Sequence, residues 1–304
     1  MGKAIKKEMS RNYQLYLIIL LPVVYIIVFH YIPMYGVQIA FKNFRATDGI
    51  WGSPWVGFEH FRKFLSTHQF GRILRNTITI SVYSLVAGFP IPIILALALN
   101  NVEKIMFKKT VQMVTYAPYF ISTVVMVGMI IQFLSPQFGI VNRIIELFGF
   151  EPILFMAEPR YFSSIYVWSG IWQGAGWGSI IYLAALSGID PTLHEAAIID
   201  GATKLQRTIY IDVPGIMPTA VILLILNAGQ IMNVGFEKVI LMQNSLNLQA
   251  SEVIATYVYK VGLASQIPRY SYGAAIGLFN AVINLFLMLV VNRIAKRLTE
   301  TSLW

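Results

Sequence analysis

Cysteine is absent from the 304-residue chain, and charged residues make up only 12% of it. The lack of cysteine excludes disulfides and thiolate metal sites. A water-soluble domain of this length carries roughly a quarter charged residues, so a hydrophobic content of 57% must face something other than water. Several uncharged runs approach the ~20 residues that a helix needs to cross a bilayer. The composition therefore predicts an all-α polytopic membrane protein.

Sequence patterns of catalytic and nucleotide-binding sites are also missing. There is no G-x-x-x-x-G-K-[ST] phosphate loop, the four histidines have no metal-ligand spacing, and no serine lies in a nucleophile-elbow pattern. We therefore expect no catalytic residue, no metal site and no cofactor in this chain. The net charge of +9 comes from basic residues beside apolar runs, where the positive-inside rule explains them without nucleic-acid binding.

Six membrane-spanning helices are expected from the apolar runs. Their approximate ranges are Tyr13–Phe41, Asn76–Asn100, Val111–Leu134, Phe162–Ser187, Gly215–Phe236 and Tyr272–Asn292. The first run is overlong and contains Pro22 and Pro33, which predict a kink or an extension beyond the membrane. It lacks a small-residue cleavage site and is expected to be retained as a helix.

The distribution of Lys and Arg favours a plasma-membrane protein with both termini in the cytoplasm. The two sides carry nearly equal numbers, but the residues assigned to the inner side lie close to span ends, where they determine orientation. We expect three regions: residues 1–75, with a cytosolic tail, the first helix and an aromatic outer loop; residues 76–292, a core of five helices; and residues 293–304, a cytosolic tail.

The loop between the fourth and fifth spans carries the most specific local pattern. Asp190 followed by Pro191 predicts a helix start, and Gly201 predicts its end about ten residues later. A second helical run is expected around Thr203–Tyr210, and Pro214 is expected to break the chain before the fifth span. The short helix suits insertion into a groove on another protein. From the residues alone, an ordinary amphipathic connector is an equal alternative.

Within this loop, residues 188–214, Glu-Ala-Ala is followed by Gly after three residues and by Ile-x-Val-Pro after nine more. The residues concerned are Glu195, Ala196, Ala197, Asp200, Gly201, Ile211 and Pro214. This spacing resembles the EAA loop of binding-protein-dependent ABC importer permeases, although that family usually closes on Leu-Pro rather than Val213-Pro214. The resemblance implies the type I importer permease (MetI-like) fold with six transmembrane helices, and a coupling helix that docks into an ATPase subunit.

Outer segments extend the resemblance toward carbohydrate uptake. Pro33–Gly36, Phe41–Phe44, Trp55–Phe61 and Arg75–Thr77 look like the corresponding parts of permeases for oligosaccharides and complex polysaccharides. The family then implies a heterodimer with a second homologous permease, two ATPase subunits that bind ATP and Mg²⁺, and an extracellular solute-binding lipoprotein that delivers the glycan. This chain would form half of the path through the membrane lipid.

Two alternatives remain at this point. One is a permease of the same type for a solute that is not a sugar. The other is a secondary transporter, which would need a charged relay in the middle of the membrane, whereas Glu237 lies too near a span end for that role.

Polar side chains within the spans are the candidates for the substrate path, because they tend to face protein or a water-filled cavity. Asn227, Gln230 and Asn233 share one face of a continuous fifth helix, and their amides offer the donors and acceptors that sugar hydroxyls need. The further candidates are Trp172, Gln173, Tyr116, Tyr119, Asn280 and Asn284. Hydrogen bonding between helices is the alternative role for the amides.

Overall fold

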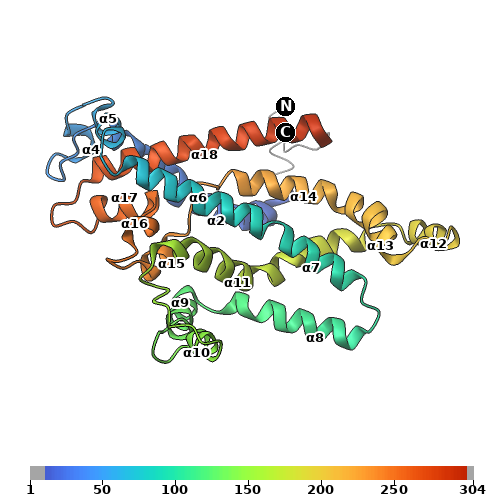
Figure 1. Ribbon diagram of the computed structural model, residues 1–304. Coiled ribbons are helices and arrows are strands. Elements are labelled where there is room, and N and C mark those ends of the chain that lie inside the picture. Colours follow the sequence, from blue (N-terminus) through green and yellow to red (C-terminus); the bar gives the residue numbers. More distant parts are fainter. Residues whose placement is uncertain (1–10, 300–304) are drawn as a thin grey trace. The chain divides into compact units, whose positions relative to one another are not determined.

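The computed structural model describes residues 11–299, so residues 1–10 and 300–304 of the expected tails lie outside the described part (Figure 1). The described residues form helices and no strand beyond two isolated bridges, Lys42–Trp55 and Arg45–Gly49. The chain divides into two compact units. The first comprises Met1–Ser66 and Val258–Leu278, and the second comprises Thr67–Tyr257 and Phe279–Trp304.

The first unit begins with an unbroken helical stretch that matches the predicted first span. Its parts are α2 (Tyr13–Ile26), a π-helical turn (Ile27–Tyr31), α3 (Ile32–Met34) and a 3-10 turn (Tyr35–Phe41). The change of helical type follows Pro22, which removes a backbone donor inside α2. Two short helices follow, α4 (Gly49–Gly52) and α5 (Glu59–Leu65).

Aromatic packing organises the loop after this first span. Phe41 stacks on Trp55 with ring centroids 5.8 Å apart and meets Phe58 edge-on at 5.4 Å. Trp51 and Trp55 stay 78% and 64% exposed. Rings that pack on one another and still present an outer surface are typical of a segment at a membrane interface.

The second unit is built around one long helix, α11 (Pro159–Ser187), which contacts α6, α7, α8, α14 and α16. The helices of this unit before α11 are α6 (Phe70–Gly88), α7 (Pro90–Asn100), α8 (Ile105–Tyr116), α9 (Thr123–Phe133) and α10 (Ile140–Leu147). Those after it are α12 (Pro191–Ile199), α13 (Lys204–Arg207), α14 (Val213–Ala228), α15 (Phe236–Met242) and α16 (Leu248–Ser251). Two helices contribute to both units, α17 (Ile254–Gly262) and α18 (Tyr270–Thr299).

Four helical stretches in the described residues are long and apolar enough to cross a membrane. They are Tyr13–Phe41, Phe70–Asn100, Lys204–Ala228 and Tyr270–Arg297. A fifth is added if the bent pair Ile105–Phe120 and Thr123–Phe133 counts as one span. The expected fourth span is α11, whose many glycine and polar residues make it less apolar than these. The helical, polytopic class is confirmed, and the count of six stays a prediction.

The expectation of a single third helix over Val111–Leu134 is wrong. The chain bends by 102° between the segment ending at Phe120 and α9. Pro118 lies in a 3-10 turn at this point, and Ser122 starts α9 by accepting a hydrogen bond from the Val125 N–H. Gln173 of α11 donates to the Ile121 carbonyl at 2.8 Å. The freed backbone carbonyl at the bend is thereby satisfied inside the protein.

The expected bounds of the fifth helix are also wrong at both ends. A continuous helix runs from Lys204 through a π-helical turn (Thr208–Asp212) into α14, so Pro214 does not break the chain. The π-helical turn directly before Pro214 changes the backbone hydrogen-bond pattern at the position where the proline lacks an N–H. At the other end α14 stops at Ala228 rather than Phe236, and residues 229–235 are irregular.

Candidate functional site

The short helix α12 forms where the local sequence predicts it. Asp190 caps it by accepting a hydrogen bond from the Thr192 N–H at 2.9 Å. This bond stabilises the carboxylate and lowers the pKa of Asp190. After α12, Gly201 takes φ of +79°, and the Ala202 N–H reaches back to the Ala197 carbonyl at 2.8 Å. A glycine is favoured at this left-handed position because it has no Cβ.

A second cap redirects the chain from α12 into the long helix. The Thr203 side chain accepts from the Gln206 N–H, and the Gln206 side chain accepts from the Thr203 N–H. This reciprocal capping box satisfies two otherwise free donors. The expected second helical run is confirmed, but it is the first turn of a helix that continues into α14 rather than a separate element.

Side-chain contacts bring α12 against the turn before α14, and α13 against the turn after α7. His194 Nε2 lies 3.2 Å from Asp212 Oδ1, and Asp212 is only 2% exposed. Lys204 pairs with Glu103 in the turn after α7, and this hydrogen bond lowers the pKa of Glu103. Figure 1 shows α12 and α13 at one end of the second unit, together with the turn that joins α7 to α8.

Large apolar side chains are exposed at the end of α12. Ile199 is 86% exposed and Ile198 55%. Glu195, Ala196, Asp200, Gly201 and Pro214 of the predicted coupling set are exposed, whereas Ala197 and Ile211 are half-buried. Apolar side chains clustered beside carboxylates on a surface are typical of a protein-binding site.

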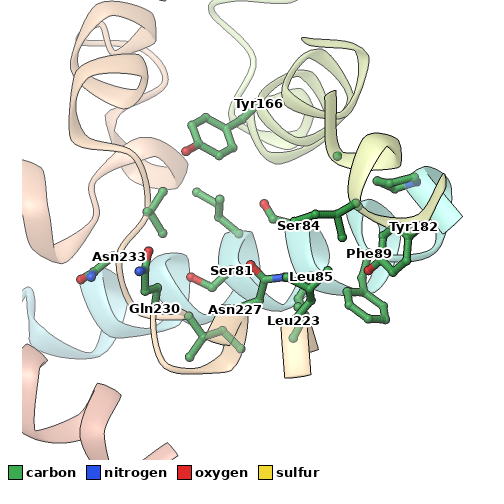
Figure 2. A pocket seen from close by; sticks show the side chains of 17 residues that line it. Ser81, Ser84, Leu85, Phe89, Tyr166, Tyr182, Leu223, Asn227, Gln230 and Asn233 are labelled. Atoms are coloured by element: carbon green, nitrogen blue, oxygen red, sulfur yellow. The ribbon is translucent and has the colours of Figure 1, made fainter. Parts of the chain in front are cut away.

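A cavity of about 490 Å³ lies elsewhere in the second unit, between α6, α7, α11 and the end of α14 (Figure 2). Its polar lining includes Ser81, Ser84, Tyr166, Asn227 and Gln230. Tyr166 lies across the cavity from Asn227 and Gln230 (Figure 2). Among the described residues, the lining contains hydroxyls and amides but no Asp, Glu, Lys or Arg. Such a surface can bind hydroxyl-rich molecules by hydrogen bonds and apolar contact.

The predicted residues Asn227, Gln230 and Asn233 all line this cavity. The expectation that they share one face of a continuous fifth helix is wrong. Their positions come from the end of α14 and the irregular segment 229–235, not from one helical face. Turns close through bonds such as Asn233 N–H to the Gln230 carbonyl at 2.8 Å. In transport proteins, breaks of this kind in a helix form binding sites from side-chain and main-chain polar groups together.

Asn280 and Asn284 of α18 support the irregular segment. Both side chains donate to Asn233 Oδ1, at 2.9 and 3.1 Å. Asn284 Oδ1 also accepts from the Met232 N–H at 2.9 Å, and Asn284 is 7% exposed. Of the two roles that the sequence allows for these residues, the contacts match hydrogen bonding between segments.

The remaining predicted path residues do not line this cavity. Trp172 borders a separate apolar pocket of about 390 Å³ beside α9, and Gln173 supports the bend before that helix. Tyr119 stacks on Trp177 with centroids 4.6 Å apart. Tyr116 is half-buried at the end of α8.

Sequence reasoning missed several site residues. Ser81, Ser84 and Tyr166 line the cavity, but a lone serine or tyrosine in an apolar run carries no distinctive signal. The contact between His194 and Asp212 joins residues on two elements. The one sequence signal for this contact is that both residues lie within segment 188–214, which carries the coupling-loop motif.

Comparison with known proteins identifies the family. Residues 69–300 match the model of the binding-protein-dependent transport system inner membrane component. The chain belongs to this family of ABC importer permeases. The permease is 39% identical over 305 residues to Protein LplB of Bacillus subtilis, covering 100% of this chain and 95% of that one. It is 40% identical over 290 residues to the polygalacturonan/rhamnogalacturonan transport system permease protein YteP of the same organism, covering 95% and 90%.

Solved structures show the same fold. One chain comes from a bacterial ABC transporter involved in the import of the acidic polysaccharide alginate, with a TM-score of 0.89 and 40% identity over 97% of the permease and 99% of that chain. A second comes from a bacterial alginate ABC transporter in complex with an alginate pentasaccharide-bound periplasmic protein, with a TM-score of 0.89 and 39% identity over 98% and 99%. The permease is thus a multi-pass membrane subunit with the fold that its coupling-loop motif implied.

Proposed function

We propose that this permease forms half of the path by which an ATP-driven importer carries an oligosaccharide across the plasma membrane. A second, non-identical permease supplies the other half. Two ATPase subunits bind ATP and Mg²⁺, and an extracellular solute-binding protein delivers the glycan. Both termini and α12 then lie in the cytoplasm. The observation that carries this proposal is the amide- and hydroxyl-lined cavity in a chain whose relatives are named for polysaccharide transport.

The coupling role rests on the surface of α12. Glu195, Ala196 and Ile199 are exposed, and His194 of the helix lies 3.2 Å from Asp212, directly before α14. A partner that grips this surface therefore pulls on the base of a helix whose far end borders the cavity. The sequence contains no phosphate loop, so in this proposal the ATP hydrolysis that drives transport takes place on another subunit.

The test is reconstitution of the complete importer in proteoliposomes. We expect ATP-dependent uptake of an oligosaccharide only when this permease, its partner permease, the ATPases and the binding protein are all present. The purified permease alone is expected to hydrolyse no ATP. Uptake driven by a proton gradient with the ATPases omitted would contradict the proposal.

Asn227→Leu is expected to slow oligosaccharide uptake by roughly 2- to 10-fold, the effect of one lost hydrogen bond. Asn227 lines the cavity and is exposed, so the melting temperature should not change. Asn284→Leu is the matched variant. This substitution removes the acceptor of the Met232 N–H and should destabilise the protein by ~1–3 kcal/mol. Equal uptake by Asn227→Leu and the wild type would show that Asn227 does not contact the transported substrate.

A further inference from the structure

Lys238 is a buried cation close to the cavity. It lies in α15, directly after the irregular segment 229–235, and is only 9% exposed. Lysine is almost never buried to this degree unless it is paired. Lys238 takes part in none of the ion pairs between described residues. No carboxylate within residues 11–299 therefore pairs with its ammonium group.

The ammonium group packs against α11 at the residue that lines the cavity. Lys238 Nζ donates to the Tyr166 carbonyl at 2.8 Å and lies 4.7 Å from the centroid of the Tyr166 ring. A Cβ on Gly170 would lie 3.3 Å from Nζ, so that glycine leaves room for the ammonium. Tyr166 in turn borders the cavity, and its hydroxyl accepts from the Gly235 N–H at 3.0 Å.

Burial lowers the pKa of Lys238 to about 8. The desolvated amine is therefore still mostly protonated at neutral pH. In the described part of the chain, no charged residue lines the cavity, so no acid there opposes the field of this ammonium. Two unit charges about 10 Å apart, at an effective dielectric constant of about 20, attract strongly enough to change a binding constant roughly tenfold.

We propose that Lys238 makes the cavity selective for glycans that carry carboxylates, that is, for uronate oligosaccharides over neutral ones. This inference rests on the proposed function. A fixed positive charge behind a hydroxyl- and amide-lined wall attracts an anion without binding it in a direct ion pair. A transported substrate must be bound weakly enough to leave the cavity again, and an attraction without a direct ion pair is weak in this way. The permease's relatives include one named for polygalacturonan and one for alginate, an acidic polysaccharide.

The experiment compares two substrates that differ only in charge. An oligogalacturonate and its carboxyl-reduced, neutral counterpart are offered to the complete importer in proteoliposomes, and an oligoalginate is the second acidic probe. Uptake is measured for the wild type, Lys238→Met, Lys238→Gln and Lys238→Arg. All variants use the same binding protein, so its own preference cancels when each acidic-to-neutral ratio is divided by the wild-type ratio.

We expect Lys238→Met and Lys238→Gln to lower the acidic-to-neutral uptake ratio roughly tenfold, while Lys238→Arg keeps it. A purely structural lysine would reduce uptake of both substrates equally and leave the ratio unchanged, which would overturn the inference. If neither neutral variant assembles, a wild-type importer that shows no preference for the acidic form would also overturn it. Absence of all oligosaccharide uptake by the wild type would instead count against the proposed function.

Discussion

The substitution Gly176→Ala is expected to prevent the permease from folding stably. Gly176 lies on α11 where α8 crosses it, and a Cβ there would lie 2.0 Å from the Thr115 carbonyl oxygen. That oxygen belongs to the backbone, so the two helices would have to move apart. Close helix contacts at small residues are a main source of stability in membrane bundles. We expect a loss of about 3 kcal/mol, at the upper end of the range for overpacking.

Gly174→Ala provides the matched control for this substitution. It lies on the same helix, and a Cβ there meets nothing within 4 Å. Thermal unfolding in detergent and the yield of monodisperse protein distinguish the two variants. The control should behave like the wild type or slightly better, because alanine favours a helix more than glycine does. Equal melting temperatures for Gly176→Ala and Gly174→Ala would mean that α8 and α11 do not pack as closely as described.

Glu195→Lys is expected to abolish coupling to the ATPase subunits while leaving the permease folded. Glu195 is exposed on α12, so a lysine costs little within this chain. A reversed charge on a docking surface faces whatever basic groups the partner presents, and such a mismatch costs several kcal/mol. Uptake should fall to background, and the ATPases should no longer co-purify with the permease.

Glu151→Lys is the control for that charge reversal. Glu151 is also exposed but lies in the loop before α11, far along the chain from α12. It should keep both ATPase binding and uptake. Normal recovery of the ATPases with Glu195→Lys would show that the coupling surface has been placed wrongly.

Local chemistry explains which parts of the fold were predictable. Asp190, Pro191 and Gly201 act on their own neighbours, so the bounds of α12 followed directly from the sequence. The capping box at Thr203 is equally local, but only the helical run there was predicted from the sequence, and not the cap. Of the residues predicted for coupling, those from Glu195 to Gly201 lie in α12 or directly after it, whereas Ile211 and Pro214 lie in the continuous helix Lys204–Ala228. Their role in docking remains a prediction.

Long-range contacts explain what sequence reasoning missed. The end of α14 at Ala228 was not predicted, because the apolar pattern runs on through Met232 and Val234. The irregular segment is held by Asn284 of α18, which is distant in the sequence. Likewise, Gln173 supports the bend before α9. A polar side chain that stabilises a broken helix elsewhere leaves no local signal at the break.

On the proposed function, the unbroken helix from Lys204 to Ala228 would act as a lever arm. Its 25 residues span about 37 Å at ~1.5 Å per residue. Pivoting such an arm by about 10° sweeps its far end through about 6 Å, on the scale of one helical turn. Asp212, in the half of this helix nearer α12, lies 3.2 Å from His194 of α12, and Asn227 stands at the far end. On the same proposal, a small rotation imposed at the base would be amplified into a displacement wide enough to withdraw the Asn227 amide from a sugar hydroxyl.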